Sequence, residues 1–264
     1  MRRYKKVNIA FLHVPKTGGR SLMRLLRRNY LPRSMMLYYP PKHVDVAPMS
    51  GHGNLFIGHY SMGKQHEVFA DCELVTFLRD PADRLISHIF FMQRYYTQPH
   101  IPPDNVYKRW FQENTDVFDV LRFSRLWYLD NAMVRMISGV RDSVPVGELD
   151  GSALERAKAN LQRFGFIGFQ ESFEDDLLRL CRQYQLKAVI SRRNRGFNRY
   201  TPSEKDHELL ASRSEFDAEL YQFARAMTAR EGIGAGTALK MKALGRARNI
   251  YLTPLEMLLR EVRR

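Results

Sequence analysis

A lysine, two glycines and a serine stand close together in residues 15–21 (PKTGGRS), and these residue types are suited to holding a phosphate group. Glycine lets the backbone approach an anion, and the amide groups at the start of a helix converge on one point. Lys16 would add a mobile cation and Ser21 a hydroxyl donor. Because Lys16 precedes the glycines, the spacing differs from the Walker A pattern, in which the lysine follows them. The segment therefore predicts a different kind of phosphate site, or a tight turn made by Gly18 and Gly19 alone.

Eight histidines supply candidates for a general base, because imidazole titrates near neutral pH. His13 directly precedes the phosphate segment, His52 lies in residues 50–53 (SGHG), and His59 lies in residues 58–60 (GHY). Residue type alone does not choose among them. The two cysteines lie far apart in the chain and have no paired histidines, so they give no signature of a zinc site.

The elements that must position these residues alternate between strand and helix. Residues 7–14 (VNIAFLHV) predict a buried strand, and residues 20–30 carry leucines at helical spacing. Residues 73–78 predict a second strand, Arg79 closes it, and Asp80 is suited to cap a helix that starts with proline. Further strands are predicted at 54–60 and 165–169, further helices at 106–139, 149–164 and 173–184, and a loop at 31–54. We therefore expect an α/β fold with a mostly parallel central sheet flanked by helices.

The positive charge of the chain is concentrated in a few segments. The net charge is +14, and residues 1–44 hold eleven lysines and arginines without an acidic residue. Residues 187–205 and 232–264 are also basic. Such blocks attract an anion, and a nucleic acid, an anionic membrane, a phosphorylated cofactor or an acidic polysaccharide would each fit. The glycines of residues 232–237 predict a linker, which divides the chain into a domain at 1–231 and a basic helical tail at 232–264.

Composition excludes several other classes of protein. With 264 residues, 44% of them hydrophobic, the chain is neither a disordered nor a fibrous sequence. No segment has the pattern of a signal peptide or of a transmembrane helix. Two unpaired cysteines favour a reducing compartment, so we expect a cytoplasmic protein.

Two segments, in this order, resemble the sulfotransferase family. Residues 13–21 (HVPKTGGRS) resemble its 5′-phosphosulfate loop, and residues 78–88 (LRDPADRLISH) resemble its 3′-phosphate segment, Arg-Asp-Pro-x-x-Arg-x-x-Ser. The sequence is most similar to carbohydrate O-sulfotransferases of the heparan sulfate 2-O and 6-O type and their bacterial relatives. Shorter fragments agree in the same order, at residues 58–60, 131–139, 168–173 and 216–221. Arg20 departs from the pattern, because relatives often carry threonine or serine there.

The resemblance implies a P-loop-like nucleotide-binding fold and the donor 3′-phosphoadenosine 5′-phosphosulfate (PAPS). Lys16 would then stabilise the leaving oxygen, and His59 would deprotonate the acceptor hydroxyl, with His52 as the second choice and His13 as a support. The expected donor contacts are Lys16, Thr17, Gly18, Gly19, Arg20 and Ser21 for the 5′-phosphate, Arg79 and Ser87 for the 3′-phosphate, and Arg195 and Gly196 in the basic loop 192–199. That loop is equally expected to be a solvated surface. No metal is implied.

The acceptor and one arginine remain open at this stage. The resemblance implies a hydroxyl of a carbohydrate, an acidic saccharide included, or of another small molecule. Arg84 lies four residues after Asp80, so an ion pair within the helix competes with a ligand contact.

Two other functions compete with sulfuryl transfer. A kinase with a divergent phosphate loop would also use residues 15–21, but the second strand ends in Arg79 rather than in an acidic magnesium ligand. A nucleic-acid-binding protein would explain the net charge of +14. Because no helix-turn-helix, RNA-binding or zinc signature is found, we expect no nucleic-acid partner.

Overall fold

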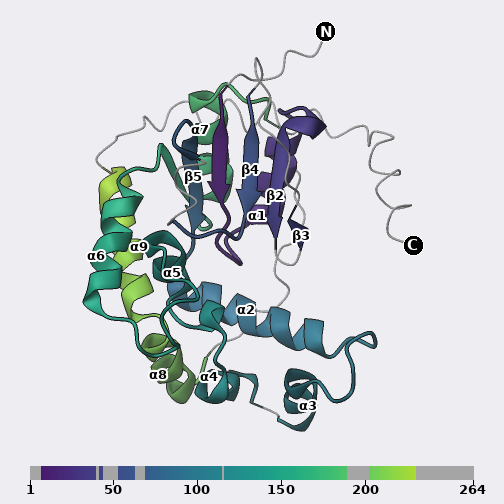
Figure 1. Ribbon diagram of the computed structural model, residues 1–264. Helices are drawn as coiled ribbons and strands as arrows, with labels where there is room; N and C mark the ends of the chain where they lie inside the picture. Colours follow the sequence, from purple (N-terminus) through teal and green to yellow (C-terminus); the bar gives the residue numbers. More distant parts are fainter. Residues whose placement is uncertain are drawn as a thin grey trace. The chain divides into compact units, whose positions relative to one another are not determined.

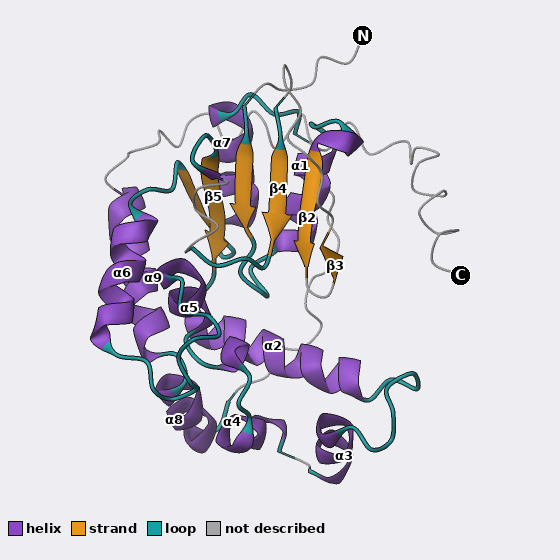
Figure 2. Ribbon diagram, viewed as in Figure 1, coloured by secondary structure: helices purple, strands orange, loops and turns teal. Residues whose placement is uncertain are grey.

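The computed structural model describes residues 7–39, 42–43, 53–62, 69–114, 116–188 and 202–229. In this part of the chain six strands form one sheet in the order β3-β2-β4-β1-β5-β6 (Figure 2). They are β1 (Ile9–Leu12), β2 (Met35–Tyr39), β3 (Lys42–His43), β4 (Leu55–Gly58), β5 (Glu73–Leu78) and β6 (Phe166–Phe169). Neighbouring strands run parallel, except that β3 pairs antiparallel with β2. The predicted α/β fold with a mostly parallel sheet is confirmed.

The strand order changes direction at β1. From β1 the chain passes to β2 and β4 on one side, and it then crosses to β5 and β6 on the other side. In open sheets of this kind, ligands bind in the crevice at the carboxyl ends of the two strands where the direction changes. Here these strands are β1 and β5, which are in register from Ile9 opposite Glu73 to Leu12 opposite Thr76. The segments that follow β1 and β5 therefore meet at one edge of the sheet.

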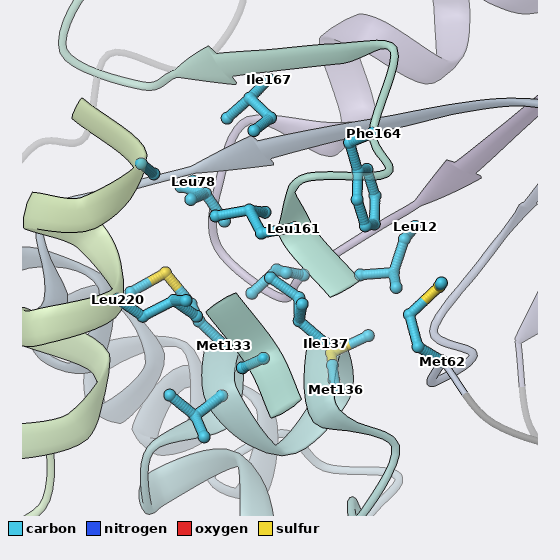
Figure 3. Close-up of a cluster of buried hydrophobic side chains, with 14 of the residues drawn as sticks. Leu12, Met62, Leu78, Met133, Met136, Ile137, Leu161, Phe164, Ile167 and Leu220 are labelled. Carbon is cyan, nitrogen blue, oxygen red and sulfur yellow. The ribbon is translucent and has the colours of Figure 1, made fainter. Parts of the chain in front are cut away.

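Helices cover both faces of the sheet (Figure 1). Ile9 and Phe11 of β1 pack in a core with α1 and α7, whereas Ala10 and Leu12 pack in a core with α5, α6 and α9. Figure 3 shows the second core, to which Leu12 belongs together with Met133 of α5, Leu161 of α6 and Leu220 of α9. Side chains of a strand point alternately to opposite faces, and both faces are covered, so all four residues of β1 are buried. The helices named here are α1 (Gly19–Arg27), α5 (Ala132–Ser138), α6 (Gly151–Leu161), α7 (Phe173–Gln183) and α9 (Glu215–Ala229).

A third hydrophobic core lies away from the sheet, around the long helix α2 (Pro81–Tyr96). α2 crosses the carboxyl end of the sheet, and α3, α4 and α8 lie on its far side (Figure 1). Leu85 and Ile89 of α2 pack with Phe118 and Leu210 in this core. Asp80 caps α2 by accepting a hydrogen bond from the Asp83 amide at 3.0 Å, and Pro81 is its first residue, as predicted. The other helices here are α3 (Val106–Glu113), α4 (Val120–Phe123) and α8 (Glu204–Ser212), with 3-10 turns at Pro32–Ser34, Val117–Asp119 and Trp127–Leu129.

The prediction of a loop at residues 31–54 was wrong for part of the segment. Residues Met35–Tyr39 form β2, which pairs with β4 from Met35 opposite Leu55 to Tyr38 opposite Gly58. The flanking prolines signal a turn locally, but pairing with a strand far along the chain fixes these residues as extended. The predicted boundary between residues 231 and 232 stays a prediction, because the described residues end at 229. None of the described helices has the length and apolar character needed to span a bilayer.

Candidate active site

The loop between β1 and α1 has a conformation that few residues adopt. Lys16 and Gly18 have φ angles of 74° and 84°, in the left-handed region, and α1 begins directly afterwards at Gly19. Thr17 is fully buried, and its hydroxyl donates to the Val14 carbonyl oxygen at 2.9 Å, which holds the loop closed. The Ser21 amide donates to the Gly18 carbonyl oxygen at 3.0 Å, which forms the first turn of α1. The predicted strand, glycine loop and helix are confirmed as a local structure.

Neighbouring side chains require glycine at both Gly18 and Gly19, and the left-handed backbone conformation favours glycine at Gly18 as well. A Cβ atom at Gly18 would lie 2.2 Å from Oε1 of Gln170, and one at Gly19 would lie 1.8 Å from Nε2 of His13. Real Cβ atoms do not approach other atoms so closely, so any larger residue would displace the side chain against it. The glycines therefore let His13 and Gln170 pack directly against the loop.

Four cations gather around this loop. The pKa of Lys16 is lowered to about 8, first by burial and then by the charges of Arg94, Arg20 and Arg79. Nζ of Lys16 lies 4.6 Å from the centre of the Phe91 ring on α2, which brings α2 to the loop. Within the part of the chain that the structure describes, the one ion pair of these four cations joins Arg79 to Asp83, at 3.7 Å. Because these four cations have one carboxylate partner among the described residues, their net positive charge attracts an anion.

Arg79 lies at the junction of β5 and α2, and Ser87 lies farther along α2. Arg79 follows the last residue of β5, and its Nη1 donates to the Lys16 carbonyl oxygen at 3.4 Å. Its Nε is buried and has no hydrogen-bond partner among the described residues. Ser87 is half-buried on α2, one turn before Phe91, the residue that contacts Lys16. Both predicted 3′-phosphate contacts therefore lie on segments that touch the loop.

His59 directly follows β4, next to the end of β1. Its Nδ1 lies 2.6 Å from the carbonyl oxygen of His13. A carbonyl oxygen only accepts hydrogen bonds, so Nδ1 carries the proton and the lone pair of neutral His59 is on Nε2. Burial lowers the pKa of His59 and outweighs this hydrogen bond, which raises it. His59 is therefore neutral at physiological pH, in the tautomer in which Nε2 accepts a proton.

The charges of His59 and Lys16 both act on two buried histidines, His13 and His88. The pKa of His13 is lowered by burial and then by the charges of His59, Arg20 and Lys16. The pKa of His88 on α2 is lowered by burial and then by Arg84, Lys16 and His59. The candidate base and the candidate stabilising cation thus follow two neighbouring strands, β4 and β1, at the same edge of the sheet.

Three residues of the site were missed by sequence reasoning. Arg94 follows Ser87 and Phe91 at helical spacing on α2, so this stripe was visible in the sequence. Gln170 lies in the fragment 168–173, where the resemblance gave it no role. Arg141 donates a hydrogen bond to the His59 carbonyl oxygen and lies 5.2 Å from the Trp127 ring. Its contact with His59 spans 82 positions in the chain, and no local pattern indicates it.

Some predicted residues are not part of the described site. His52, Arg195 and Gly196 lie outside the described residues. Arg84 is fully buried on α2, and the expected ion pair with Asp80 is wrong: its Nε lies 3.7 Å from Oδ2 of Asp217, and its Nη1 donates to the Tyr128 carbonyl oxygen at 3.1 Å. Asp217 on α9 is fully buried, as Arg84 is, whereas Asp80 is half-buried and its carboxylate caps the helix. The buried guanidinium pairs with the carboxylate that shares its interior position, because an unpaired buried charge is costly. Among the described residues, no three carboxylate, histidine or cysteine side chains are grouped as a metal site would need.

In a comparison with known protein families, residues 2–224 match the family model described as "Sulfotransferase family". A solved structure, that of mouse sulfotransferase SULT7A1 complexed with PAP, is similar over 82% of this chain and 67% of that chain, with 13% sequence identity and a TM-score of 0.36. No curated protein matches the sequence.

Proposed function

The chain belongs to the sulfotransferase family, and from that premise we propose that it transfers a sulfuryl group from PAPS to a hydroxyl group of an acceptor. The observation that carries the proposal is the pairing of a cation-rich loop at the end of β1 with a neutral histidine at the end of β4. The donor, when bound, supplies the sulfuryl group and a phosphorylated leaving group. The residues of this chain hold the donor, neutralise charge and accept a proton.

The donor fits the charges of the loop. Its product, adenosine 3′,5′-bisphosphate, is a multiply charged anion, and Lys16, Arg20, Arg79 and Arg94 gather with a single carboxylate partner among the described residues. The buried Nε of Arg79 has no hydrogen-bond partner in the same part of the chain, and a phosphate oxygen would satisfy it. We assign Arg79 and Ser87 to the 3′-phosphate. The loop amides of 17–20 and the Ser21 hydroxyl are assigned to the 5′-phosphate.

Lys16 acts on the leaving group. Negative charge develops on the bridging oxygen as the sulfuryl group departs, and a fixed cation stabilises that charge. Lys16 keeps most of its charge at neutral pH because its pKa is about 8. Binding of the anionic donor raises this pKa and so favours the charged form.

His59 acts as the general base. Its Nε2 holds the lone pair, because Nδ1 donates to the His13 carbonyl oxygen at 2.6 Å. A neutral imidazole in a fixed tautomer accepts the proton of the acceptor hydroxyl as that oxygen attacks sulfur. The hydrogen bond from Arg141 to the His59 carbonyl oxygen holds the backbone of the base in place.

We extend the proposal to the acceptor class. The segments 13–21 and 78–88 resemble those of carbohydrate O-sulfotransferases, so the acceptor is a hydroxyl of a carbohydrate or of another small molecule. Arg94 is exposed, and its charge acts on Lys16, so positive charge near the reacting group is compatible with an acidic saccharide.

A transfer assay with PAPS labelled in its sulfuryl group tests the proposal. We expect label on a hydroxyl-bearing acceptor from a panel of neutral and acidic saccharides, identified by mass analysis of the product. His59→Ala should lower the rate by about 10²–10⁴-fold. The exposed His100, which is outside the site, provides the matched control, because His100→Ala should leave the rate unchanged. Transfer of phosphate from ATP with magnesium, in place of sulfuryl transfer, would show that the chain is a kinase.

A further inference from the structure

His13 is a buried residue that touches both halves of the proposed active site. Its ring stacks on the ring of His59, with centroids 4.6 Å apart and planes 28° apart. On the other side, Nε2 of His13 occupies the space where a side chain at Gly19 would begin, 1.8 Å from the ideal Cβ position. His13 thus lies between the first residue of α1 and the candidate base.

The backbone of His13 joins the same two halves. Its amide donates to the Gly58 carbonyl oxygen at 2.8 Å, one residue beyond the last paired position of β1 and β4. Its carbonyl oxygen accepts the hydrogen bond from Nδ1 of His59 at 2.6 Å. The backbone therefore sets the tautomer of His59, whereas the stacked ring sets where the imidazole of His59 lies.

A simple core role does not account for these contacts. Ile9 and Phe11 precede His13 on the same face of β1, and Phe11 stacks on His13 at 5.4 Å. A hydrophobic residue would continue that face at lower cost of burial, since a buried imidazole must satisfy polar atoms. The imidazole is short enough to reach the backbone of Gly19 and flat enough to stack on His59. Burial also keeps it uncharged, because the pKa of His13 lies well below 6.5, so it adds no charge beside Lys16.

We propose that His13 is a positioning residue for sulfuryl transfer, whose ring sets the separation between the start of α1 and the imidazole of His59. The inference rests on the proposed function. The donor loop and the base are then coupled through a single side chain. A substitution that displaces the His13 ring should disturb the donor loop and the base together. A substitution that removes the ring should disturb only the position of the base.

A suppressor experiment tests this coupling. Gly19→Ala drives a methyl group into the His13 ring, and His13→Ala leaves room for that methyl group. We would measure three quantities for each single variant and the double variant: the dissociation constant of adenosine 3′,5′-bisphosphate by calorimetry, kcat, and the thermal midpoint. Gly151→Ala is the matched control, because Gly151 is also the first residue of a helix and its Cβ would meet nothing within 4 Å.

The expected pattern separates binding from turnover. Gly19→Ala should weaken binding of the bisphosphate about tenfold and lower the midpoint by about 4 °C. His13→Ala should leave binding within about threefold of wild type but lower kcat about tenfold or more, because small displacements of a reacting group are costly. The double variant should recover binding and midpoint to the level of His13→Ala, while its kcat stays low. Gly151→Ala should behave as wild type.

Two results would overturn the inference. In the first, the double variant binds and unfolds no better than Gly19→Ala. In the second, His13→Ala keeps kcat within about twofold of wild type, an effect too small for a positioning role. Failure of the wild-type protein to bind the bisphosphate would instead contradict the proposed function. The thermal midpoints would then still report whether His13 and Gly19 compete for one space.

Discussion

Arg79, just before α2, and Arg84, in its first turn, lie five positions apart, yet their surroundings are opposite. The Arg79 side chain is 23% exposed and approaches a carboxylate that is itself 60% exposed. The Arg84 side chain and its partner Asp217 are both fully buried. The charge of Arg79 is therefore accessible at the carboxyl edge of the sheet, whereas the charge of Arg84 is paired with Asp217 inside the protein.

The same contrast extends to the regions around them. At the sheet edge Lys16, Arg20 and Arg94 gather near Arg79. In the layer around α5, Arg135 is fully buried and pairs with Asp130, and Asp217 accepts hydrogen bonds from the Met133 and Val134 amides at 3.2 and 2.8 Å. Positive charge that the fold leaves uncompensated marks the proposed donor site, whereas positive charge that it pairs belongs to the scaffold.

The largest effect on stability is expected from Arg84→Leu. The variant leaves the Asp217 carboxylate buried without its cation, which should lower the free energy of unfolding by about 3–5 kcal/mol. Denaturation by urea at neutral pH measures the loss. Adding Asp217→Asn should restore part of it, because the buried charge is then gone. Arg79→Leu is the matched control and should cost less than about 1 kcal/mol, since its ion pair is partly exposed. Equal losses of unfolding free energy in Arg84→Leu and Arg79→Leu would contradict the distinction between a paired scaffold arginine and an accessible one.

Asp217 also gives the scaffold a dependence on pH. Burial raises the pKa of Asp217 to about 6, from 3.8 for an ordinary aspartate. The folded protein therefore binds more protons than the unfolded chain between these values, so this group lowers stability as pH rises from about 4 to about 6. Arg84→Leu should raise this pKa further and so extend the fall above pH 6, and the same urea experiment repeated from about pH 4 to about pH 8 measures it.

Among the cations of the sheet edge, the largest effect on turnover is expected from Lys16→Ala. Removing a cation from the leaving oxygen should lower kcat about 10²–10³-fold. Because Lys16 is half-buried without an ion pair among the described residues, the thermal midpoint should stay close to that of wild type. Lys16→Arg keeps the charge and should recover part of the rate. A rate for Lys16→Ala within about threefold of wild type would remove Lys16 from the mechanism.

A fall of about tenfold in kcat/KM for the donor is expected when the pH of the assay is raised to about 9. With the pKa of Lys16 at about 8 in the free enzyme, only about a tenth of it is charged at about pH 9, so kcat/KM for the donor should fall about tenfold there. The acidic limb should lie below 6.5, because the pKa of His59 is lowered from that value and His59 loses its role when protonated. Lys16→Arg should abolish the alkaline limb. An alkaline limb that persists in this variant would assign it to another group.

The smallest effect is expected at the residue between the two arginines. Asp80→Ala removes the cap of α2, where the carboxylate accepts from the Asp83 amide, and should cost about 1 kcal/mol of stability. Affinity for the bisphosphate should not fall, because a carboxylate beside the cation-rich edge is lost. Weaker binding in Asp80→Ala would show that the position of α2 controls the donor site.

The sequence was most informative where local chemistry decides local structure. Strand, glycine loop and helix at 9–27, and strand, cap and helix at 73–96, were predicted from apolar runs, glycines and an Asp-Pro pair, and they carry most of the candidate site. The positions of Lys16, Arg79 and Ser87 followed from them, and that of His59 followed from the strand predicted at 54–60. The parallel sheet that brings these segments together followed from the alternation of elements.

Features that depend on pairing between distant segments were not predictable in this way. β2 exists because it pairs with β4, and the partner of Arg84 is Asp217 on the last described helix, not the nearby Asp80. Nothing local indicates that Arg141 reaches His59 or that His13 fills the space beside Gly19. Contacts of this kind need the folded chain.

Calorimetric titration with adenosine 3′,5′-bisphosphate tests most directly whether the uncompensated cations form the donor site. We predict micromolar binding that weakens about tenfold or more when the 3′-phosphate is removed, as in adenosine 5′-monophosphate, and when Arg79 is replaced by leucine. Equal affinity for the two nucleotides, or wild-type affinity in Arg79→Leu, would contradict the account.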